Sequence, residues 1–285
     1  MSIINKIGIG TVQFGMDYGV SNRAGRTSLD EVDKILEYAQ RMGINLLDTA
    51  RSYGDAEAVL GASGAAAEGF NIVSKFMPSK TDGSVSLQFQ QACQKLKTDR
   101  LYAYLSHRPL SLLDNNKEDW AAAQLLKTQN RVQKIGVSLN DPEELDRLNG
   151  EGINPDIVQV PYNYFDNRFK SQMIRLKTQG CEVHSRSVFL QGLFFADIDT
   201  LPPFFYEIKV RVKKLQIKYG TGLPNVLLKY VLKLPFIDKV IIGVENVRQI
   251  KENIRGIMNA VDIPEINANE SISGNILSPS NWPKV

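Results

Sequence analysis

The chain has 285 residues, of which 43% are hydrophobic and 23% are charged, an ordinary composition for a globular protein. Its 34 basic and 31 acidic residues leave a net charge of +3, which is too near balance to indicate a nucleic-acid or membrane partner. The length suits a single α/β barrel, because such barrels commonly have about 250 residues.

Two cysteines, Cys93 and Cys181, show no metal-ligand spacing and no CxxC pair, so no metal site is expected. So few cysteines in a chain of this length are typical of a reduced, cytoplasmic protein. Residues 1–10 lack the apolar core of a signal peptide. The most apolar late stretch, 226–244, is interrupted by three lysines, an aspartate and a proline, which argues against a membrane span.

Short apolar runs recur along the chain, and most are rich in β-branched or aromatic residues. They predict eight strands, at residues 7–12, 45–49, 71–76, 102–107, 134–139, 156–160, 182–187 and 239–244.

Amphipathic helical patterns lie between these runs. The first predicted helix, 28–43, has apolar residues at helical spacing, and Ser28 with Glu31 matches a capping box. Asp141 followed by Pro142 is typical of a helix start. Further helices are predicted at residues 55–62, 84–97, 117–129, 141–148, 168–180 and 245–258, with about two more within 188–238.

Strands that alternate with helices indicate a parallel sheet. Eight such units in a chain of this length favour a closed (β/α)8 TIM barrel, of the α/β class, over an open sheet. No internal linker rich in Gly, Ser or Pro divides the chain. We therefore expect a single domain over residues 1–266, followed by an irregular polar tail over residues 267–285.

Ionisable residues stand at the carboxyl ends of several predicted strands, which is where α/β barrels hold their active sites. Asp48 ends the second strand, Lys75 the third and His107 the fourth, and Tyr53 follows Asp48 after a short loop. A buried Asp48 carboxylate needs a cationic partner, which Lys75 would supply. A lysine ammonium also favours the ionised form of a nearby tyrosine, which suits proton transfer to a carbonyl oxygen.

Each of these residues has a simpler interpretation when it is taken alone. An aspartate at a strand end often caps the next helix, and a lysine there often extends to solvent. A histidine beside a proline is often a loop or core residue with satisfied hydrogen bonds. Three such residues at successive strand ends favour a catalytic group. His184, in the middle of the seventh strand, is expected to be a core or rim residue.

Several segments resemble the aldo-keto reductase superfamily. The three catalytic segments are matched by LLDTARSYGDAE (46–57), IVSKF (72–76) and YLSHRP (104–109), and further agreement lies in GIGTVQFG (8–15), DIVQVPYNYFD (156–166) and VIIGVENVRQIKENI (240–254). The resemblance covers roughly residues 7–258. It implies a (β/α)8 barrel that reduces aldehydes and ketones with NADPH, or sometimes with NADH.

The resemblance also implies roles for particular residues. Tyr53 would be the general acid, tuned by Lys75 and Asp48, and His107 would orient the substrate carbonyl. The implied cofactor-binding residues are Thr11, Asp48, Ser138, Gln159, Arg186, Ser187, Gly243, Arg248, Gln249, Glu252 and Asn253. Among these, Ser138 and Gln159 would hydrogen-bond the nicotinamide carboxamide. The family binds its dinucleotide without a GxGxxG motif, and this sequence has none.

The sequence departs from the family pattern at three places. Leu139 follows Ser138 where the family commonly has Asn, and Arg186 takes the position of a tyrosine that often stacks on the nicotinamide. The Lys and Arg that bind the 2′-phosphate in many members are replaced by Gly243 and Gln249, with Arg248 as the nearest cation. The resemblance favours NADPH, with NADH as the alternative.

Three functions stay open on the sequence alone. The favoured one is NAD(P)H-dependent reduction of an aldehyde or ketone. The second is a cofactor-binding regulatory subunit with little or no turnover, and the third is an aldolase or isomerase that uses Lys75 as a Schiff base. Arg51, Arg108 and Arg186, near the expected mouth, favour a polar or anionic small-molecule substrate. The oligomeric state is not readable from the sequence.

Overall fold

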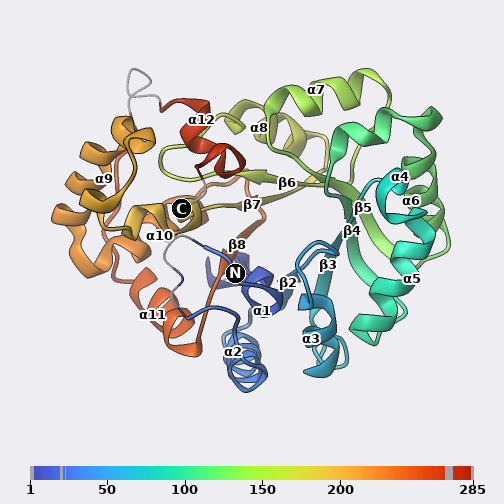
Figure 1. Cartoon of the computed structure of the whole chain (residues 1–285), viewed down its shortest axis with the longest axis horizontal. Helices are drawn as coiled ribbons and strands as arrows, with labels where there is room; N and C mark the ends of the chain where they lie inside the picture. Colours follow the sequence, from blue (N-terminus) through green and yellow to red (C-terminus); the bar gives the residue numbers. More distant parts are fainter. Residues whose placement is uncertain (1–2, 20–21, 23, 267–271, 284–285) are drawn as a thin grey trace.

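Eight parallel strands close into a barrel in the order in which they occur along the chain, and helices surround it (Figure 1). The computed structural model describes residues 3–19, 22, 24–266 and 272–283. The predicted (β/α)8 fold is confirmed. The strands are β1 (Ile7–Gly10), β2 (Leu46–Asp48), β3 (Asn71–Phe76), β4 (Leu101–Ser106), β5 (Val132–Ser138), β6 (Ile157–Pro161), β7 (Glu182–Arg186) and β8 (Lys239–Gly243).

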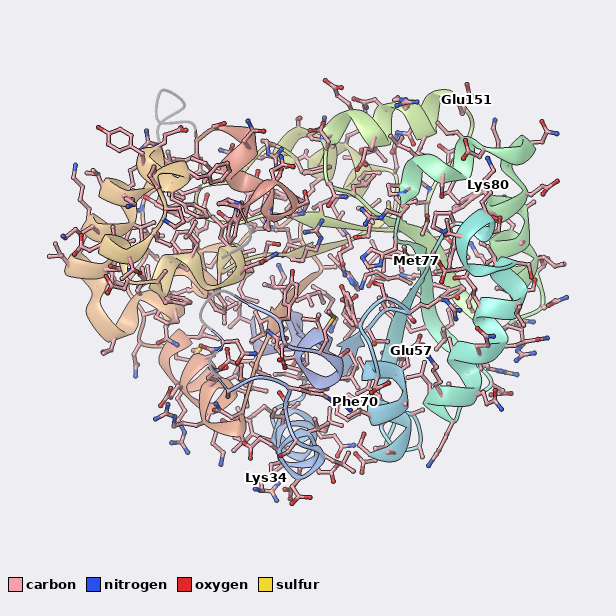
Figure 2. All side chains as sticks on the ribbon, in the orientation of Figure 1. Lys34, Glu57, Phe70, Met77, Lys80 and Glu151 are labelled. Carbon is pink, nitrogen blue, oxygen red and sulfur yellow. The ribbon has the colours of Figure 1, made fainter. Side chains whose placement is uncertain are left out.

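The helices that follow the strands begin and end within about two residues of their predicted positions. They are α2 (Leu29–Arg41), α3 (Ala56–Ala62), α5 (Val85–Leu96), α6 (Glu118–Thr128), α7 (Pro142–Gly150), α8 (Lys170–Thr178) and α11 (Val247–Ile257). The long connection between β7 and β8 holds η4 (Leu190–Phe195), α9 (Tyr206–Tyr219) and α10 (Leu223–Leu232). Charged side chains such as Lys34, Lys80 and Glu151 lie at the outer surface (Figure 2).

The two predicted helix caps have different outcomes. Asp141 forms the capping box of α7 together with Glu144, as the Asp-Pro start indicated. Ser28 lies at the N-cap of α2, but its side chain makes no capping hydrogen bond. The capping box predicted there was wrong, because the Glu31 carboxylate instead accepts a hydrogen bond of 2.7 Å from the backbone N–H of Val247. Glu31 therefore joins the start of α2 to the start of α11.

The inside of the barrel is filled by a small cluster of buried apolar side chains, separate from the larger core between the sheet and the helices. Its buried members are Leu46, Val73, Ala103, Leu105, Ile157 and Ile241. At Gly136, β5 comes close to the neighbouring strand β6, and a Cβ would lie 1.9 Å from the carbonyl oxygen of Ile157. Only glycine fits at that position.

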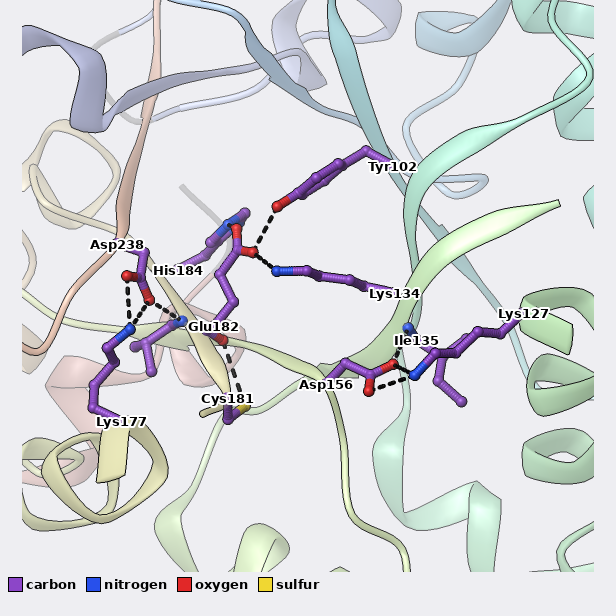
Figure 3. Close-up of polar contacts among 11 residues, drawn as sticks. Tyr102, Lys127, Lys134, Ile135, Asp156, Lys177, Cys181, Glu182, His184 and Asp238 are labelled. Atoms are coloured by element: carbon purple, nitrogen blue, oxygen red, sulfur yellow. Dashed lines mark hydrogen bonds and ion pairs between the residues drawn. The ribbon is translucent and has the colours of Figure 1, made fainter. Parts of the chain in front are cut away.

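Polar side chains from β4, β5 and β7 meet around Glu182 (Figure 3). The Glu182 carboxylate accepts hydrogen bonds from Tyr102 and Lys134 and contacts Nε2 of His184 at 2.6 Å. Burial alone would raise the pKa of Glu182, but the hydrogen bonds from His184, Lys134 and Tyr102 hold it well below its usual range. This group lies at the amino-terminal ends of the strands, where barrels place stabilising residues. The expectation that His184 is a core residue is confirmed, since none of its surface is exposed.

Two aspartates at this end join neighbouring strands (Figure 3). Asp156 precedes β6 and accepts from the backbone N–H of Ile135 in β5, and Asp238 precedes β8 and accepts from that of Val183 in β7. Each carboxylate also binds a lysine of the helix that precedes the neighbouring strand: Asp156 binds Lys127 of α6, and Asp238 binds Lys177 of α8. These bonds help to set the register of the strands.

The final described segment, residues 272–283, is more ordered than the expected irregular tail. It contains α12 (Gly274–Leu277) and a 3-10 turn, η9 (Pro279–Asn281). Ile272, Ile276 and Leu277 are buried against α9 and its neighbours. Residues 267–271 and 284–285 of the predicted tail lie outside the described residues.

Candidate active site

A buried ion pair lies at the carboxyl ends of β2 and β3. Lys75 Nζ donates to Asp48 Oδ2 at 2.7 Å and to the carbonyl oxygen of Thr49 at 2.9 Å. None of the Lys75 surface is exposed, and Asp48 is 3% exposed. The attraction between the two charges offsets the desolvation free energy that either charge would cost if it were buried alone. Burial would lower the pKa of Lys75, but Asp48 and Tyr53 outweigh it and raise that pKa, so the lysine stays an ammonium ion.

The loop after β2 brings Tyr53 over this ion pair. Lys75 Nζ lies 3.5 Å from the Tyr53 hydroxyl and 5.0 Å from the centre of its ring. Gly15 allows the loop to approach α1 (Val12–Gly15), the short helix after β1, since a Cβ on Gly15 would lie 1.9 Å from the carbonyl oxygen of Tyr53. Any larger residue at Gly15 would displace the backbone that carries Tyr53.

His107 completes the group from the end of β4. Its ring packs edge-on to that of Tyr53, with 5.8 Å between the ring centres, and its Nδ1 lies 3.0 Å from the Ser52 hydroxyl. Burial, together with the charges of Lys75, Arg186 and Arg108, lowers the pKa of His107 to about 3. The imidazole is therefore neutral at physiological pH. A hydroxyl that donates to Nδ1 leaves the N–H on Nε2 free for a substrate oxygen.

Two polar side chains on adjacent strands form a second part of the site. Ser138 of β5 pairs in register with Gln159 of β6, and both line the same cavity as Tyr53 and His107. Gln159 Nε2 donates to Asp48 Oδ1 at 2.7 Å, whereas its buried Oε1 has no hydrogen-bond partner. A buried acceptor without a partner, on a residue that lines a cavity, fits a ligand that carries an N–H donor, such as the carboxamide of nicotinamide.

Two departures from the family pattern are joined to each other. The Arg186 guanidinium donates to the carbonyl oxygen of Leu139 at 3.0 Å and to Asn140 Oδ1 at 2.7 Å. Arg186 thus reaches from the end of β7, past β6, to the loop after β5. No carboxylate among the described residues forms an ion pair with Arg186, so it leaves a positive charge in the cavity wall.

The cavity has a volume of about 760 Å³ and extends from this group of residues to the start of α11. The predicted site residues that line it are Thr11, Asp48, Tyr53, His107, Ser138, Gln159, Arg186, Ser187, Gly243, Gln249, Glu252 and Asn253. Lys75 is buried behind Tyr53 and Asp48. Arg248 does not line the cavity; its side chain is 79% exposed and lies 3.8 Å from Glu252.

The sequence did not single out several residues of the cavity wall. Ser52 and Glu245 line it, and so do Leu277 and Ser278 of the final segment. Glu245 follows β8 by two residues, so the same search for polar residues at strand ends would have found it. Arg51 was expected near the mouth, but it does not line the cavity. Its guanidinium instead binds Asp82 and Gln91 at 3.2 and 2.7 Å.

Among the described residues, no group of three or more His, Cys, Asp or Glu side chains is arranged to hold a metal ion. None of the described helices is long and apolar enough to cross a membrane. Cys93 and Cys181 are buried and form no disulfide.

The chain is a closed eight-stranded barrel that holds Asp48, Tyr53, Lys75 and His107 together at the carboxyl ends of its strands, beside a cavity. The model of the aldo/keto reductase family matches residues 6–273, so the chain belongs to that family. Among solved structures, it is similar to an aldo-keto reductase from Bacillus halodurans, AKR11C1, in its holo form. That likeness has a TM-score of 0.71 with 20% identity, and it covers 96% of this chain and 92% of the other, which supports the fold.

The curated relatives match either at about 30% identity over less than half of the chain or at lower identity over most of it. An uncharacterized oxidoreductase of Caenorhabditis elegans is 31% identical over 41% of this chain and 39% of its own length. Methylglyoxal reductase DkgA of Salmonella typhimurium is 30% identical over 47% of this chain and 50% of its own length. The chain thus spans half or less of the length of these two relatives. An NADH-specific methylglyoxal reductase of Escherichia coli is 24% identical over 89% of this chain and 90% of its own length.

Proposed function

We propose that the protein reduces an aldehyde or ketone to an alcohol, with a reduced nicotinamide dinucleotide as the hydride donor. The observation that carries the proposal is the contact of Lys75 Nζ with both Asp48 and the Tyr53 hydroxyl in one buried group. The free acceptor on Gln159 supports a nicotinamide carboxamide as the neighbour. Family membership and the names of the methylglyoxal reductases support the reaction class.

Each residue of the group has a chemical task. A bound reduced nicotinamide supplies the hydride that the carbonyl carbon receives. Tyr53 gives its phenolic proton to the carbonyl oxygen, and the ammonium of Lys75 stabilises the phenolate that is left. Asp48 keeps Lys75 charged and in place. The neutral His107 donates a hydrogen bond from Nε2 to the carbonyl oxygen and orients it toward Tyr53.

The substrate is proposed to be polar or anionic. Arg108 lines the cavity beside His107 and forms no ion pair with any described residue. Arg186 also lacks a carboxylate partner, so two positive charges surround the place where the carbonyl would bind. An anionic group on the substrate would be attracted there.

Replacement of the Tyr53 hydroxyl tests the proposal. Tyr53→Phe removes the proton donor and keeps the ring, so turnover should fall by about 10²- to 10⁴-fold while cofactor affinity stays within a few-fold. Carbonyl-dependent oxidation of NADH and NADPH measures turnover, and cofactor fluorescence on titration measures cofactor affinity. Full activity of the variant would refute the role of Tyr53. Cofactor binding without turnover of any carbonyl by the unmodified protein would instead favour a regulatory subunit.

A further inference from the structure

We propose that the cavity binds NADH in preference to NADPH, because carboxylates occupy the place where the 2′-phosphate of NADPH would lie. The inference rests on the proposed function and deepens it. It follows from the charges of the two ends of the cavity, which are opposite in sign.

The catalytic group fixes the nicotinamide at one end. Tyr53 would hold the carbonyl oxygen of the substrate, and Gln159 would hold the carboxamide of the cofactor, so the nicotinamide would bind at this end. His107 follows β4, whereas α11 follows β8, and strands four positions apart in an eight-stranded ring lie on opposite sides of the barrel (Figure 1). A dinucleotide is elongated, so its adenosine half extends from the catalytic group toward α11, where Gln249, Glu252 and Asn253 line the cavity.

The α11 end is acidic. Glu245 and Glu252 line it, whereas the positively charged residues of the cavity wall are Arg108, Arg168 and Arg186. Arg168 binds Asp166 at 2.9 Å, which balances its charge. Arg108 and Arg186 belong to the catalytic end. Among the residues that the structure describes, no lysine or arginine lines the cavity at its α11 end.

Glu245 is held in place and has no cationic partner among the described residues. Gln249 Nε2 donates to Glu245 Oε2 at 3.1 Å, and Gln249 Oε1 accepts from the backbone N–H of Glu245 at 2.8 Å. Thr27 Oγ1 donates to the Glu245 carbonyl oxygen at 3.2 Å. Gln249 is therefore committed to Glu245 and is not a free donor for phosphate. The nearest cation, Arg248, is exposed and pairs with Glu252 at 3.8 Å, so Glu245 is the carboxylate of this end that has no ion pair.

Carboxylates discriminate between the two cofactors for a simple reason. The ribose 2′-hydroxyl of NADH can donate a hydrogen bond to a glutamate carboxylate, as in other dinucleotide sites. The 2′-phosphate of NADPH has acceptors only and carries a negative charge, so it repels the same carboxylate and loses hydration without compensation.

Titration of the purified chain with each cofactor, followed by nicotinamide fluorescence, tests the inference. The Kd for NADH should be about 10- to 100-fold lower than that for NADPH. Competition with adenosine fragments isolates the α11 end: 5′-AMP should displace NADH at lower concentration than 2′,5′-ADP. Equal affinities, or tighter NADPH, would overturn the inference and leave the proposed function intact. Binding of neither cofactor would overturn both.

Two variants assign the effect to these residues. Glu245→Gln keeps the side-chain shape and removes the charge. The Kd for NADPH divided by the Kd for NADH should therefore fall about tenfold. Gln249→Arg adds a cation beside Glu245 and should move the ratio in the same direction. Glu118→Gln, on the exposed surface of α6, is the matched control and should keep the original ratio. A ratio that stays unchanged in both Glu245→Gln and Gln249→Arg would overturn the assignment.

Discussion

Gln159 and Asp48, which are 111 residues apart in the sequence, are joined by a hydrogen bond of 2.7 Å across the barrel rim. The bond uses Oδ1 of Asp48, whereas Lys75 uses Oδ2. Each carboxylate oxygen therefore has its own donor. Because the Gln159 amide nitrogen is occupied in this way, the amide is held in one orientation, and its oxygen is the atom left without a partner.

Gln159→Leu should therefore have two effects. Asp48 Oδ1 would lose a buried donor, which costs about 1–3 kcal/mol in the free energy of unfolding. The carboxamide would lose its acceptor, so the Kd of the reduced cofactor should rise about tenfold. Denaturant unfolding and fluorescence titration measure the two effects, with Gln124→Leu on the exposed side of α6 as a control. An unchanged stability would contradict the importance of the Gln159–Asp48 bond.

Lys75→Met should destabilise the protein by about 3–5 kcal/mol, because it leaves the Asp48 carboxylate buried without a cation. The double variant Lys75→Met with Asp48→Asn removes both charges and should recover much of that loss. Urea unfolding of the two single variants and the double variant gives the coupling energy. Additive losses would show that the two side chains do not act as a pair. Turnover should be lost in all three variants.

His107 should make the protein less stable in acid. Its pKa is about 3 in the folded protein, because of burial and the charges of Lys75, Arg186 and Arg108, and ~6.5 in the unfolded chain. The unfolded chain therefore binds more protons between these values. The stabilisation is present above pH ~6.5 and is lost as the pH falls toward 3, by at most about 1.4 kcal/mol per pH unit and by less where solvent screens the site.

Unfolding free energies of the unmodified protein and of His107→Asn, measured from pH 7 down to pH 4, test this expectation. The variant has no titrating ring and should depend less steeply on pH. Parallel curves for the two proteins would mean that His107 is not the group responsible.

Arg108→Gln should reduce the preference for anionic substrates. We expect the unmodified protein to have a higher kcat/KM for 4-carboxybenzaldehyde than for its neutral methyl ester, and the variant to narrow that difference about tenfold. Arg100→Gln, on an exposed surface outside the cavity, serves as the control. A preference for the neutral ester in the unmodified protein would exclude an anionic substrate class.

The fold was readable from the sequence because each unit has a complete local signal. Buried parallel strands appear as short apolar runs, and the intervening helices have one apolar face. The positions of Asp48, Lys75 and His107 at the strand ends followed from the same pattern, since strand ends meet at one rim of a barrel. The pairing of Asp48 with Lys75 and the effect of Lys75 on Tyr53 followed from charge and pKa arguments, and the resemblance added the assignment of Tyr53 as the general acid.

Other features depend on contacts that no local pattern carries. Glu31 looked like the second half of a capping box, but the backbone of α11 comes close enough to take its carboxylate. Arg51 has a long side chain that can turn either way, and Asp82 with Gln91 decides the direction. Ile272 and Ile276 lie among polar residues with no clear period. They bury their side chains only because α9 offers an apolar surface.

Leu277 and Ser278 form part of the cavity wall, and Trp282 anchors the same segment through contacts with Phe205 and with the Ile276 carbonyl oxygen. Occupation of the cavity and docking of residues 272–283 are therefore thermodynamically linked. A ligand that binds only the docked form makes undocking less favourable by its own binding free energy. Weaker docking, in turn, lowers ligand affinity by the fraction of molecules in which the wall is absent. The docking free energy of residues 272–283 is thus one of the quantities that set ligand affinity.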